Sequence, residues 1–276
     1  MAYTLIRQYD PPAVDVFRSL KGKSGHFEKG LFIAEGEKVA RKLLESSLHI
    51  PVAYMTEEHF INLQFLFEQR MDRTDVYLAT KREMEDIIGY HLHQGIMLAC
   101  RIPENRPLLT AVQEWKSPWM AVALDGIADA ENMGTIIRNA AAFGAKAVIV
   151  DGQSCNPWLR RSVRVSMGTI VDVEIIFVEH LAAALTSIRN MHPIRLIGAA
   201  LTENAINVAD LYGTGNNIVV FGSEGLGLSK EVMVACDVLA RIPMAPGADS
   251  LNVAVACGVF LYALAGPALR AEGKGT

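Results

Sequence analysis

The sequence predicts an α/β protein whose C-terminal part carries a mostly parallel sheet and whose N-terminal part is a smaller α/β domain. Three observations support this prediction. From Trp119 onward, short runs of Val, Ile, Ala and Leu alternate with segments of helical length. These runs are also apolar along nearly their whole length, which is typical of strands in parallel sheets covered on both faces. Finally, Pro103, Pro107 and Pro118 mark a break in the chain before this alternation begins.

The N-terminal domain is expected over residues 1–101, and its elements alternate in the same way. Residues 1–16 contain two adjacent prolines and predict an arm or a short helix. The elements expected after it are strand 31–36, helix 37–47, strand 51–55, helix 57–69, strand 75–79, helix 81–88 and strand 95–100. The segment 102–116 is the predicted linker, because polar residues separate its prolines.

The second domain is expected over residues 117–276. Its predicted elements are strand 119–125, helix 132–143, strand 145–150, helix 157–166, strand 171–177, helix 181–190, strand 195–200, strand 218–221, a helix from Ser229, strand 238–242 and an apolar helix opened by Ser250. The loops after the last two strands each run into a helix. In open α/β sheets ligands bind at such strand ends, because backbone N–H groups and helix N-termini converge there.

The composition indicates a well-packed soluble protein, because 51% of the residues are hydrophobic and 20% are charged. The widely spaced cysteines and the pattern of the N-terminus favour a cytoplasmic location. A net charge of -4 excludes a globally basic nucleic-acid binder, so contact with RNA requires a local patch. The N-terminus lacks the pattern of a signal peptide, and the longest apolar stretch, 253–265, is too short to cross a bilayer. Widely spaced cysteines in apolar runs favour reduced, buried thiols and no structural zinc.

Two local patches are candidates for contact with a phosphate backbone. Between residues 18 and 42, seven basic residues outnumber three acidic ones, and the loop KGKSGHFEKG lies among them. The segment PWLRRSVRVSMG adds three arginines without an acidic neighbour. A solvated helix face is the commoner role of such charge runs. The residues that these patches offer to RNA are Arg18, Lys21, Lys23, Lys29, Arg160, Arg161 and Arg164.

Five polar residues are candidates for a functional site: Asn132, Arg138, Glu224, Ser250 and Asn252. Four of them are expected at strand ends or helix beginnings, and Arg138 further along a helix. Each has an ordinary structural explanation, since Ser250 is a natural N-cap, Asn252 a local hydrogen-bonding residue and Glu224 a solvated side chain. Asn132 is expected as an N-cap or a first-turn residue, with Arg138 nearly two turns further along the helix. A dinucleotide site is disfavoured, because GSEGLG follows a late strand and no acidic residue stands twenty positions beyond it.

Three segments resemble, in order and spacing, the motifs of the TrmH/SpoU family of RNA ribose 2'-O-methyltransferases in the SPOUT superfamily. They are DGIADAENMGTIIRNAAAFG, FGSEGLGLSKEV and RIPMAPGADSLNVAVACG. In the first domain, FIAEGEKVARKLLES and HQGIMLAC resemble the substrate-binding domain that often precedes the catalytic one. Where many relatives have Asp-Pro-His before the asparagine, this chain has Asp129, Ala130 and Glu131.

The resemblance implies a deep trefoil knot, a homodimer and catalytic roles for the five polar residues. It also implies S-adenosylmethionine as methyl donor, held around Ala200, Leu201, Thr202, Gly222, Ile242, Met244 and Leu251. A guanidinium keeps its proton, so Arg138 is suited to clamp a phosphate and hold the 2'-oxygen, and the proton acceptor stays open. The added domain favours ribosomal RNA. A transfer RNA ribose enzyme, a base-nitrogen methyltransferase and a silent RNA-binding protein are the alternatives.

Overall fold

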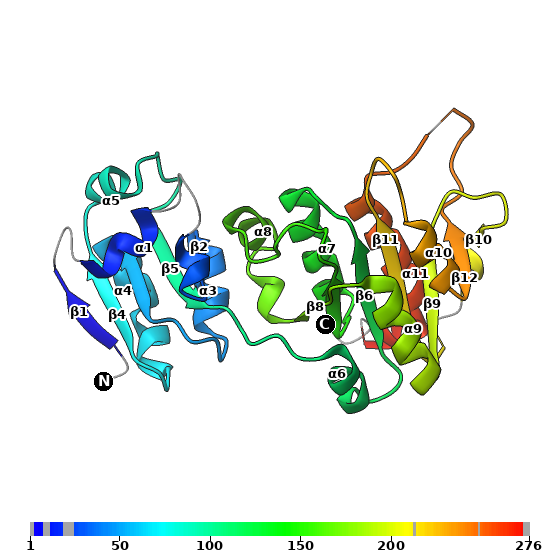
Figure 1. The fold of residues 1–276 in the computed structure, drawn as a ribbon. Coiled ribbons are helices and arrows are strands. Elements are labelled where there is room, and N and C mark those ends of the chain that lie inside the picture. Colours follow the sequence, from blue (N-terminus) through cyan, green and yellow to red (C-terminus); the bar gives the residue numbers. More distant parts are fainter. Residues whose placement is uncertain (1–2, 8–11, 19–24, 212–213, 248, 273–276) are drawn as a thin grey trace. The chain divides into compact units, whose positions relative to one another are not determined.

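The computed structural model describes residues 3–7, 12–18, 25–211, 214–247 and 249–272, with side chains described up to 265. Two compact units make up the chain (Figure 1): unit 1 contains Met1–Glu104 and Trp158–Val171, and unit 2 contains Asn105–Pro157 and Asp172–Thr276. The first boundary falls inside the segment predicted as a linker. The segment 158–171, predicted within the second domain, packs with unit 1 instead. The chain therefore passes between the units three times.

Unit 1 has a mixed sheet of order β1-β4-β3-β5-β2, in which β5 runs antiparallel to both neighbours and the other pairs are parallel. The strands are β1 (Tyr3–Ile6), β2 (Leu31–Glu35), β3 (Val52–Met55), β4 (Thr74–Leu78) and β5 (Ile96–Arg101). The prediction of an arm or short helix over residues 1–16 is wrong for β1, which pairs with β4. Tyr3 packs edge-on against Phe60 and Phe67, so distant contacts stabilise this strand.

Helices cover both faces of this sheet. They are α1 (Asp15–Arg18), α2 (Gly25–Glu28), α3 (Glu37–Leu44), α4 (Glu57–Gln69), α5 (Lys81–Ile88) and α8 (Arg160–Val165). Helix α5 begins at a capping box, in which the side chain of Thr80 accepts from the backbone N–H of Glu83 and the side chain of Glu83 accepts from that of Thr80. The helix is capped at its C-terminal end by Gly89, whose backbone is left-handed. Phe17 of α1 stacks on Tyr54 in the core beneath α5.

The segment 158–171 is held in unit 1 at three points. The ring of Trp158 packs against Phe32 of β2, with centroids 4.8 Å apart. Arg160 donates to Glu35, also on β2, over 2.8 Å. Gly168 has a φ of +82° and lies so close to α3 that an added Cβ would come within 3.0 Å of the Lys42 side chain. A ring contact, an ion pair and a close backbone approach thus attach this segment to unit 1.

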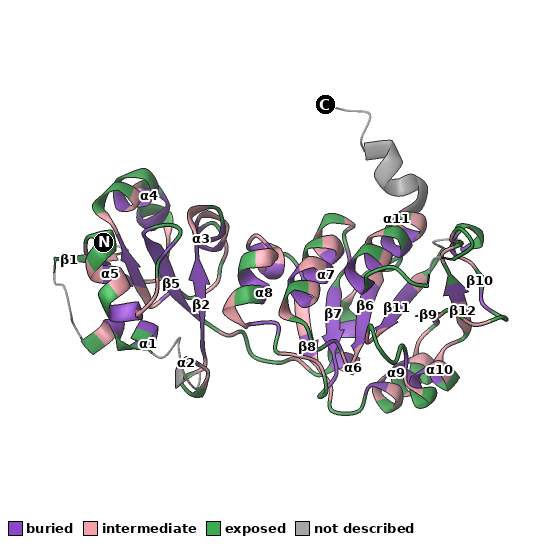
Figure 2. Ribbon diagram, turned by 90° about the horizontal axis from the view of Figure 1, so that it is seen from above, coloured by how far each residue is buried: buried purple, intermediate pink, exposed green. Residues whose placement is uncertain are grey.

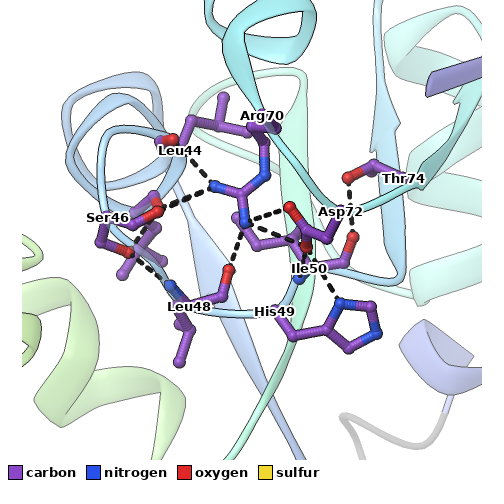
Figure 3. Close-up of polar contacts among 9 residues, drawn as sticks. Leu44, Ser46, Leu48, His49, Ile50, Arg70, Asp72 and Thr74 are labelled. Atoms are coloured by element: carbon purple, nitrogen blue, oxygen red, sulfur yellow. Dashed lines mark hydrogen bonds and ion pairs between the residues drawn. The ribbon is translucent and has the colours of Figure 1, made fainter. Parts of the chain in front are cut away.

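A buried arginine closes the C-terminal end of α3 (Figure 3). The side chain of Arg70 is 4% exposed. Its guanidinium donates to the carbonyl oxygens of Leu44 at 2.8 Å, Ser46 at 3.1 Å and Leu48, and also to the carboxylate of Asp72 at 3.0 Å. The last carbonyls of a helix have no partner within the helix, so this side chain supplies the missing donors.

Unit 2 has a parallel sheet of order β10-β12-β9-β11-β6-β7-β8. Its strands are β6 (Met120–Asp125), β7 (Ala147–Val150), β8 (Glu174–Phe177), β9 (Ile194–Ala199), β10 (Ile206–Asn207), β11 (Asn216–Gly222) and β12 (Val238–Arg241). Every pairing recorded within this sheet is parallel, which confirms the fold class predicted from the sequence. The central strands β6, β7 and β11 are buried along most of their length (Figure 2).

Two layers of helices enclose the sheet of unit 2 (Figure 2). Helices α7 (Ala130–Ala142) and α11 (Val253–Glu272) cover one face, and α6 (Leu108–Glu114), α9 (Leu181–Met191) and α10 (Lys230–Ala235) cover the other. Helix α6 lies in the predicted linker, but its apolar side chains Leu108, Ala111 and Val112 are buried in the core of unit 2. Among the described residues, no helix has the length and apolarity needed to cross a membrane.

Candidate functional site

Neighbouring strands of unit 2 end at one edge of the sheet, since parallel strands point the same way. The loops after β9, β11 and β12 enclose a cavity of about 440 Å³ at this edge. That volume is in the range of small-molecule sites. All seven residues predicted to hold the methyl donor line it: Ala200, Leu201, Thr202, Gly222, Ile242, Met244 and Leu251. Glu224 and Ser250 line it as well.

The glycine-rich loop after β11 folds back tightly on itself. Gly227 donates its backbone N–H to the carbonyl of Ser223 over 2.8 Å, and these two residues form a β-bridge. A Cβ on Gly222 would lie 2.1 Å from the carbonyl carbon of Gly227, so no other residue fits there without moving the backbone. Asp125, at the end of β6, accepts from the N–H of Ser229 over 2.6 Å and holds the far end of the loop.

The cavity wall suits a ligand that is mostly apolar and carries a few polar groups. Leu228, Met233 and Phe260 supply apolar surface, while Glu224 and Arg241 are the charged residues that line it. The hydroxyl of Thr202 is buried and has no hydrogen-bond partner among the described residues. A buried polar atom without a partner is costly, so this hydroxyl fits a bound ligand with a hydrogen-bonding group.

Three of the five predicted catalytic side chains form one hydrogen-bonded cluster beside the cavity. The side-chain amide of Asn252 donates to Oδ1 of Asn132 over 2.8 Å and to Oε1 of Glu224 over 2.7 Å. Its own Oδ1 accepts from the backbone N–H groups of Ala254 and Val255 at 3.0 and 3.2 Å. Asn252 therefore uses its full hydrogen-bonding capacity and holds the other two side chains in place.

Helix caps explain how the cluster is positioned. Asp129 is the N-cap of α7 and accepts from the N–H groups of Glu131 and Asn132 at 2.8 and 2.9 Å, so Asn132 lies in the first turn. The prediction that Ser250 opens the last helix is wrong, because Asn252 caps α11 and Val253 is its first residue. Both are good N-cap residues only two positions apart, so local sequence could not decide between them.

The other two predicted catalytic residues are not bonded to this cluster. Arg138 is exposed on α7, and the structure records no hydrogen bond or ion pair from its side chain to another described residue. Ser250 is exposed on the cavity wall and likewise has no side-chain hydrogen bond within the described chain. Arg138 follows Asn132 by six positions, about 120° away around the helix. Both side chains are therefore available to a substrate.

The residues predicted to bind RNA are distributed through unit 1. Lys21 and Lys23 lie outside the described residues. Lys29, Arg161 and Arg164 are exposed, and Arg18 is exposed with an ion pair to Asp15. Arg160 turns inward, where it donates to Glu35 and to the hydroxyl of Tyr90 and lies 4.4 Å from the centre of the tyrosine ring. Burial, followed by the positive charge of Arg160, lowers the pKa of the buried His26 nearby.

Two site features were not predicted from the sequence. Arg241 lines the cavity, although an arginine that ends a strand gives no local signal of a binding role. Asn139 bonds the first turn of α11, with its amide 2.8 Å from the carbonyl oxygen of Ala254. Its spacing from Asn132 was the available signal, because residues seven apart share one side of a helix.

A parallel α/β sheet with a ligand-sized cavity at its carboxyl edge and a polar cluster beside that cavity defines the class of α/β enzymes that act on a bound small molecule. The chain belongs, more narrowly, to the SpoU rRNA Methylase family, whose sequence profile matches residues 120–262.

Similar proteins agree with this assignment. An uncharacterized tRNA/rRNA methyltransferase of Mycobacterium tuberculosis is 31% identical over 265 residues, which cover 92% of this chain and 88% of the relative. The 23S rRNA (guanosine-2'-O-)-methyltransferase RlmB of Coxiella burnetii is 34% identical over 194 residues, covering 68% of this chain and 75% of the relative. The AdoMet-bound rRNA methyltransferase of Sinorhizobium meliloti has the same fold, with a TM-score of 0.78, 23% identity and coverage of 96% of this chain and 98% of its own.

Proposed function

We propose that this protein transfers the methyl group of S-adenosylmethionine to a ribose 2'-hydroxyl of ribosomal RNA. The observation that carries the proposal is the bonded cluster of Asn132, Glu224 and Asn252 beside the cavity. It joins the three sequence segments that resemble the family's motifs, which lie far apart along the chain. Membership of the SpoU family and the names of the relatives described above support the same reaction.

The cavity is the proposed site of the methyl donor. S-adenosylmethionine supplies a methyl group on a positively charged sulfur, which becomes a neutral thioether when the methyl group leaves. The apolar wall can take the adenine, and the buried Thr202 hydroxyl can bond it or the sugar. Glu224 places a negative charge on the cavity wall that suits the cationic sulfur of the donor, and Arg241 places a positive charge on the same wall. We also propose the knot around this site, as the family resemblance implies.

The polar cluster is the proposed site of the ribose. Asn252 fixes Asn132 and Glu224, while Oε2 of Glu224 and the amide nitrogen of Asn132 have no hydrogen-bond partner among the described residues and can orient the 2'-hydroxyl. A guanidinium group offers several N–H donors in a fixed geometry, so Arg138 serves as a clamp for the adjacent phosphate and for the charge that develops on the 2'-oxygen. Glu224 is the negatively charged member of the cluster and is the group we assign to take the hydroxyl proton.

Unit 1 is the proposed RNA-binding unit. Arg161 and Arg164 are exposed on α8, and Lys29 is exposed after α2. Cations of this kind bind phosphates without reading the base. Two named relatives that cover about two thirds of this chain methylate 23S ribosomal RNA, which favours ribosomal over transfer RNA here.

We further propose that unit 2 forms a homodimer through α11. The buried face of this helix, with Ala254, Cys257 and Leu261, is part of the core. On its other side Val255, Val259 and Tyr262 are exposed and follow one another at helical spacing. An exposed apolar stripe of this kind is typical of a subunit interface. Sedimentation of the full chain measures whether it pairs.

The experiment that tests the proposed function is transfer of labelled methyl from S-adenosylmethionine to undermethylated total RNA, with ribosomal and transfer RNA then separated and digested to nucleosides. We expect label in 2'-O-methyl nucleosides of ribosomal RNA. Label in transfer RNA alone would overturn the choice of substrate, and label in methylated bases would overturn the reaction. If the protein binds the donor but transfers methyl to no RNA, the alternative of an RNA-binding protein without catalytic activity is favoured.

A variant of Arg138 tests the catalytic assignment. We expect Arg138→Ala to lower turnover by about a hundredfold while donor affinity stays within about twofold, because the clamp acts on the RNA and on developing charge. Lys146→Ala is the matched control, since Lys146 is an exposed cation beyond the end of the same helix. Unchanged turnover in a folded Arg138→Ala protein would remove that role.

A further inference from the structure

Helices α7 and α11 are joined by two asparagines of α7. Asn132, in the first turn of α7, accepts from Asn252. Asn139, seven residues later, donates to the carbonyl oxygen of Ala254 over 2.8 Å. Seven residues are close to two helical turns, so both side chains leave α7 on the side that faces α11. The two contacts lie on the first turn of α11 and on the residue that caps it.

Ala254 links the second contact to the polar cluster. Its carbonyl accepts from Asn139, and its backbone N–H donates to Oδ1 of Asn252 over 3.0 Å. One residue therefore connects Asn139 to the side chain that holds Asn132 and Glu224. A slide of α11 along α7 would stretch both the bond from Asn139 to Ala254 and the bond from Asn252 to Asn132.

The neighbouring turn of α11 lies against this amide. Gly258 lies opposite Asn139, and an added Cβ there would be 3.4 Å from the amide nitrogen. Glycine within a helix is less favourable than alanine. An alanine at position 258 would meet the amide at ordinary van der Waals distance.

We propose that Asn139 is a positioning residue: through Ala254 it fixes the register of α11 against α7 and so keeps Asn252 bonded to Asn132 and Glu224. The inference deepens the proposed function and rests on it for the kinetic effect. Asn139 is not among the residues that line the cavity. It acts through Asn252, whose amide has no spare hydrogen-bonding capacity with which to adjust to a shift.

The kinetic test separates positioning from stability. Asn139→Ala should lower kcat about tenfold and leave KM for the methyl donor within about twofold, because a small displacement of reacting groups slows chemistry more than binding. Asn139→Ala combined with Gly258→Ala should recover the melting temperature, since alanine favours the helix and fills part of the vacated space. It should not recover kcat, because the hydrogen bond is still absent.

Two control variants accompany these measurements. Thr135→Ala removes a side-chain hydrogen bond that stays within α7, from Thr135 to the carbonyl of Glu131 at 2.8 Å, and should leave kcat unchanged. Gly258→Ala alone should raise the melting temperature and leave kcat unchanged. If the double variant regains kcat together with stability, Asn139 has only a structural role and the proposal is overturned.

A spectroscopic measurement keeps the test independent of the RNA reaction. The side-chain amide protons of Asn252 give their own signals in a nitrogen-15 correlation spectrum of the full chain. In Asn139→Ala these signals should shift although residue 139 does not touch them, and in Thr135→Ala they should stay in place. Unchanged Asn252 signals in Asn139→Ala would overturn the positioning role. Shifted signals in a protein whose wild type transfers no methyl group would instead overturn the proposed function alone.

Discussion

The two units use polar side chains in opposite ways. In unit 1, Arg70 and Arg160 turn into the protein, and each donates to several groups of the chain itself. In unit 2, Asn252 bonds Asn132 and Glu224 beside a cavity, and these two partners keep capacity for further hydrogen bonds. The difference teaches that an arginine-rich or amide-rich motif does not by itself mark a ligand site. A ligand site is marked by side chains that are held by hydrogen bonds within the protein and still have donors or acceptors available to a ligand.

This comparison predicts that changes to the inward-facing arginines of unit 1 lower folding stability and that changes to the polar cluster of unit 2 lower activity.

Arg70→Met should have the largest effect, a loss of about 3–5 kcal/mol, because it leaves Asp72 and a group of helix-end carbonyls without their donor. Arg73→Met is the matched control: that side chain is 70% exposed, and Asp75 is its one ion-pair partner among the described residues. Its effect should stay within about 0.5 kcal/mol. Urea unfolding followed by circular dichroism measures both. Equal losses in the two variants would break the contrast between buried and exposed arginines.

Acid should weaken the same cluster. Hydrogen bonds from Arg70, His49 and Ile50 outweigh desolvation and hold the pKa of Asp72 at about 2, below its ordinary value of 3.8. Because the folded-state pKa is the lower one, the ionised carboxylate stabilises the fold above pH 3.8, and this contribution is lost as the pH falls toward 2. It amounts to at most about 2 kcal/mol.

The measurement compares wild type with Asp72→Asn. The stability gap between the two proteins should be full at pH 5 and should shrink steadily between pH 4 and pH 2. A gap that stays constant over this range would show that the charge of Asp72 does not contribute.

Arg160→Met should cost about 1–3 kcal/mol, because it strands the carboxylate of Glu35, whose side chain is 4% exposed. Adding Glu35→Leu should restore part of the loss, since the stranded charge is then gone. Arg164→Met, on the exposed side of the same helix, should leave stability unchanged and weaken RNA binding in a filter assay. If Arg164→Met lowered stability and Arg160→Met weakened RNA binding instead, Arg160 would be the residue that contacts RNA.

Asn252→Asp should have the smallest effect on stability and a large one on activity. Aspartate keeps the acceptor that caps α11, and its charge suits a helix N-terminus. It cannot donate to Asn132, and it repels Glu224. Methyl transfer should fall by about a hundredfold, with a change in melting temperature within about 2 °C. Retained transfer would show that the bonded cluster is dispensable.

Much of the fold could be predicted because unit 2 repeats one pattern, in which apolar strands alternate with helices of similar length. The local pattern could not reveal that 158–171 belongs to unit 1, since contacts such as Trp158 with Phe32 join residues far apart in the chain. It also could not reveal that Arg160 points inward while Arg164 points outward on one short helix. That choice depends on Glu35, an acidic residue in a strand. No local sequence pattern identifies the residue with which Glu35 pairs.

The family resemblance made it possible to predict which residues group around the cavity. They come together because three loops meet at one edge of the sheet. The cap of α11 could not be predicted, because the decision between Ser250 and Asn252 depends on Asn132 and Glu224, which reach Asn252 across the fold.

The three passages of the chain between the units affect how this protein can be divided and recombined. A cut after Glu104 does not release unit 1, because the fragment would lack Trp158 and Arg160 and would expose Phe32 and Glu35. A hybrid made by joining the first 104 residues to another catalytic unit would have the same defect. Unit 1 is transferable only together with the insert between β7 and β8, so these two parts of the chain must be exchanged together.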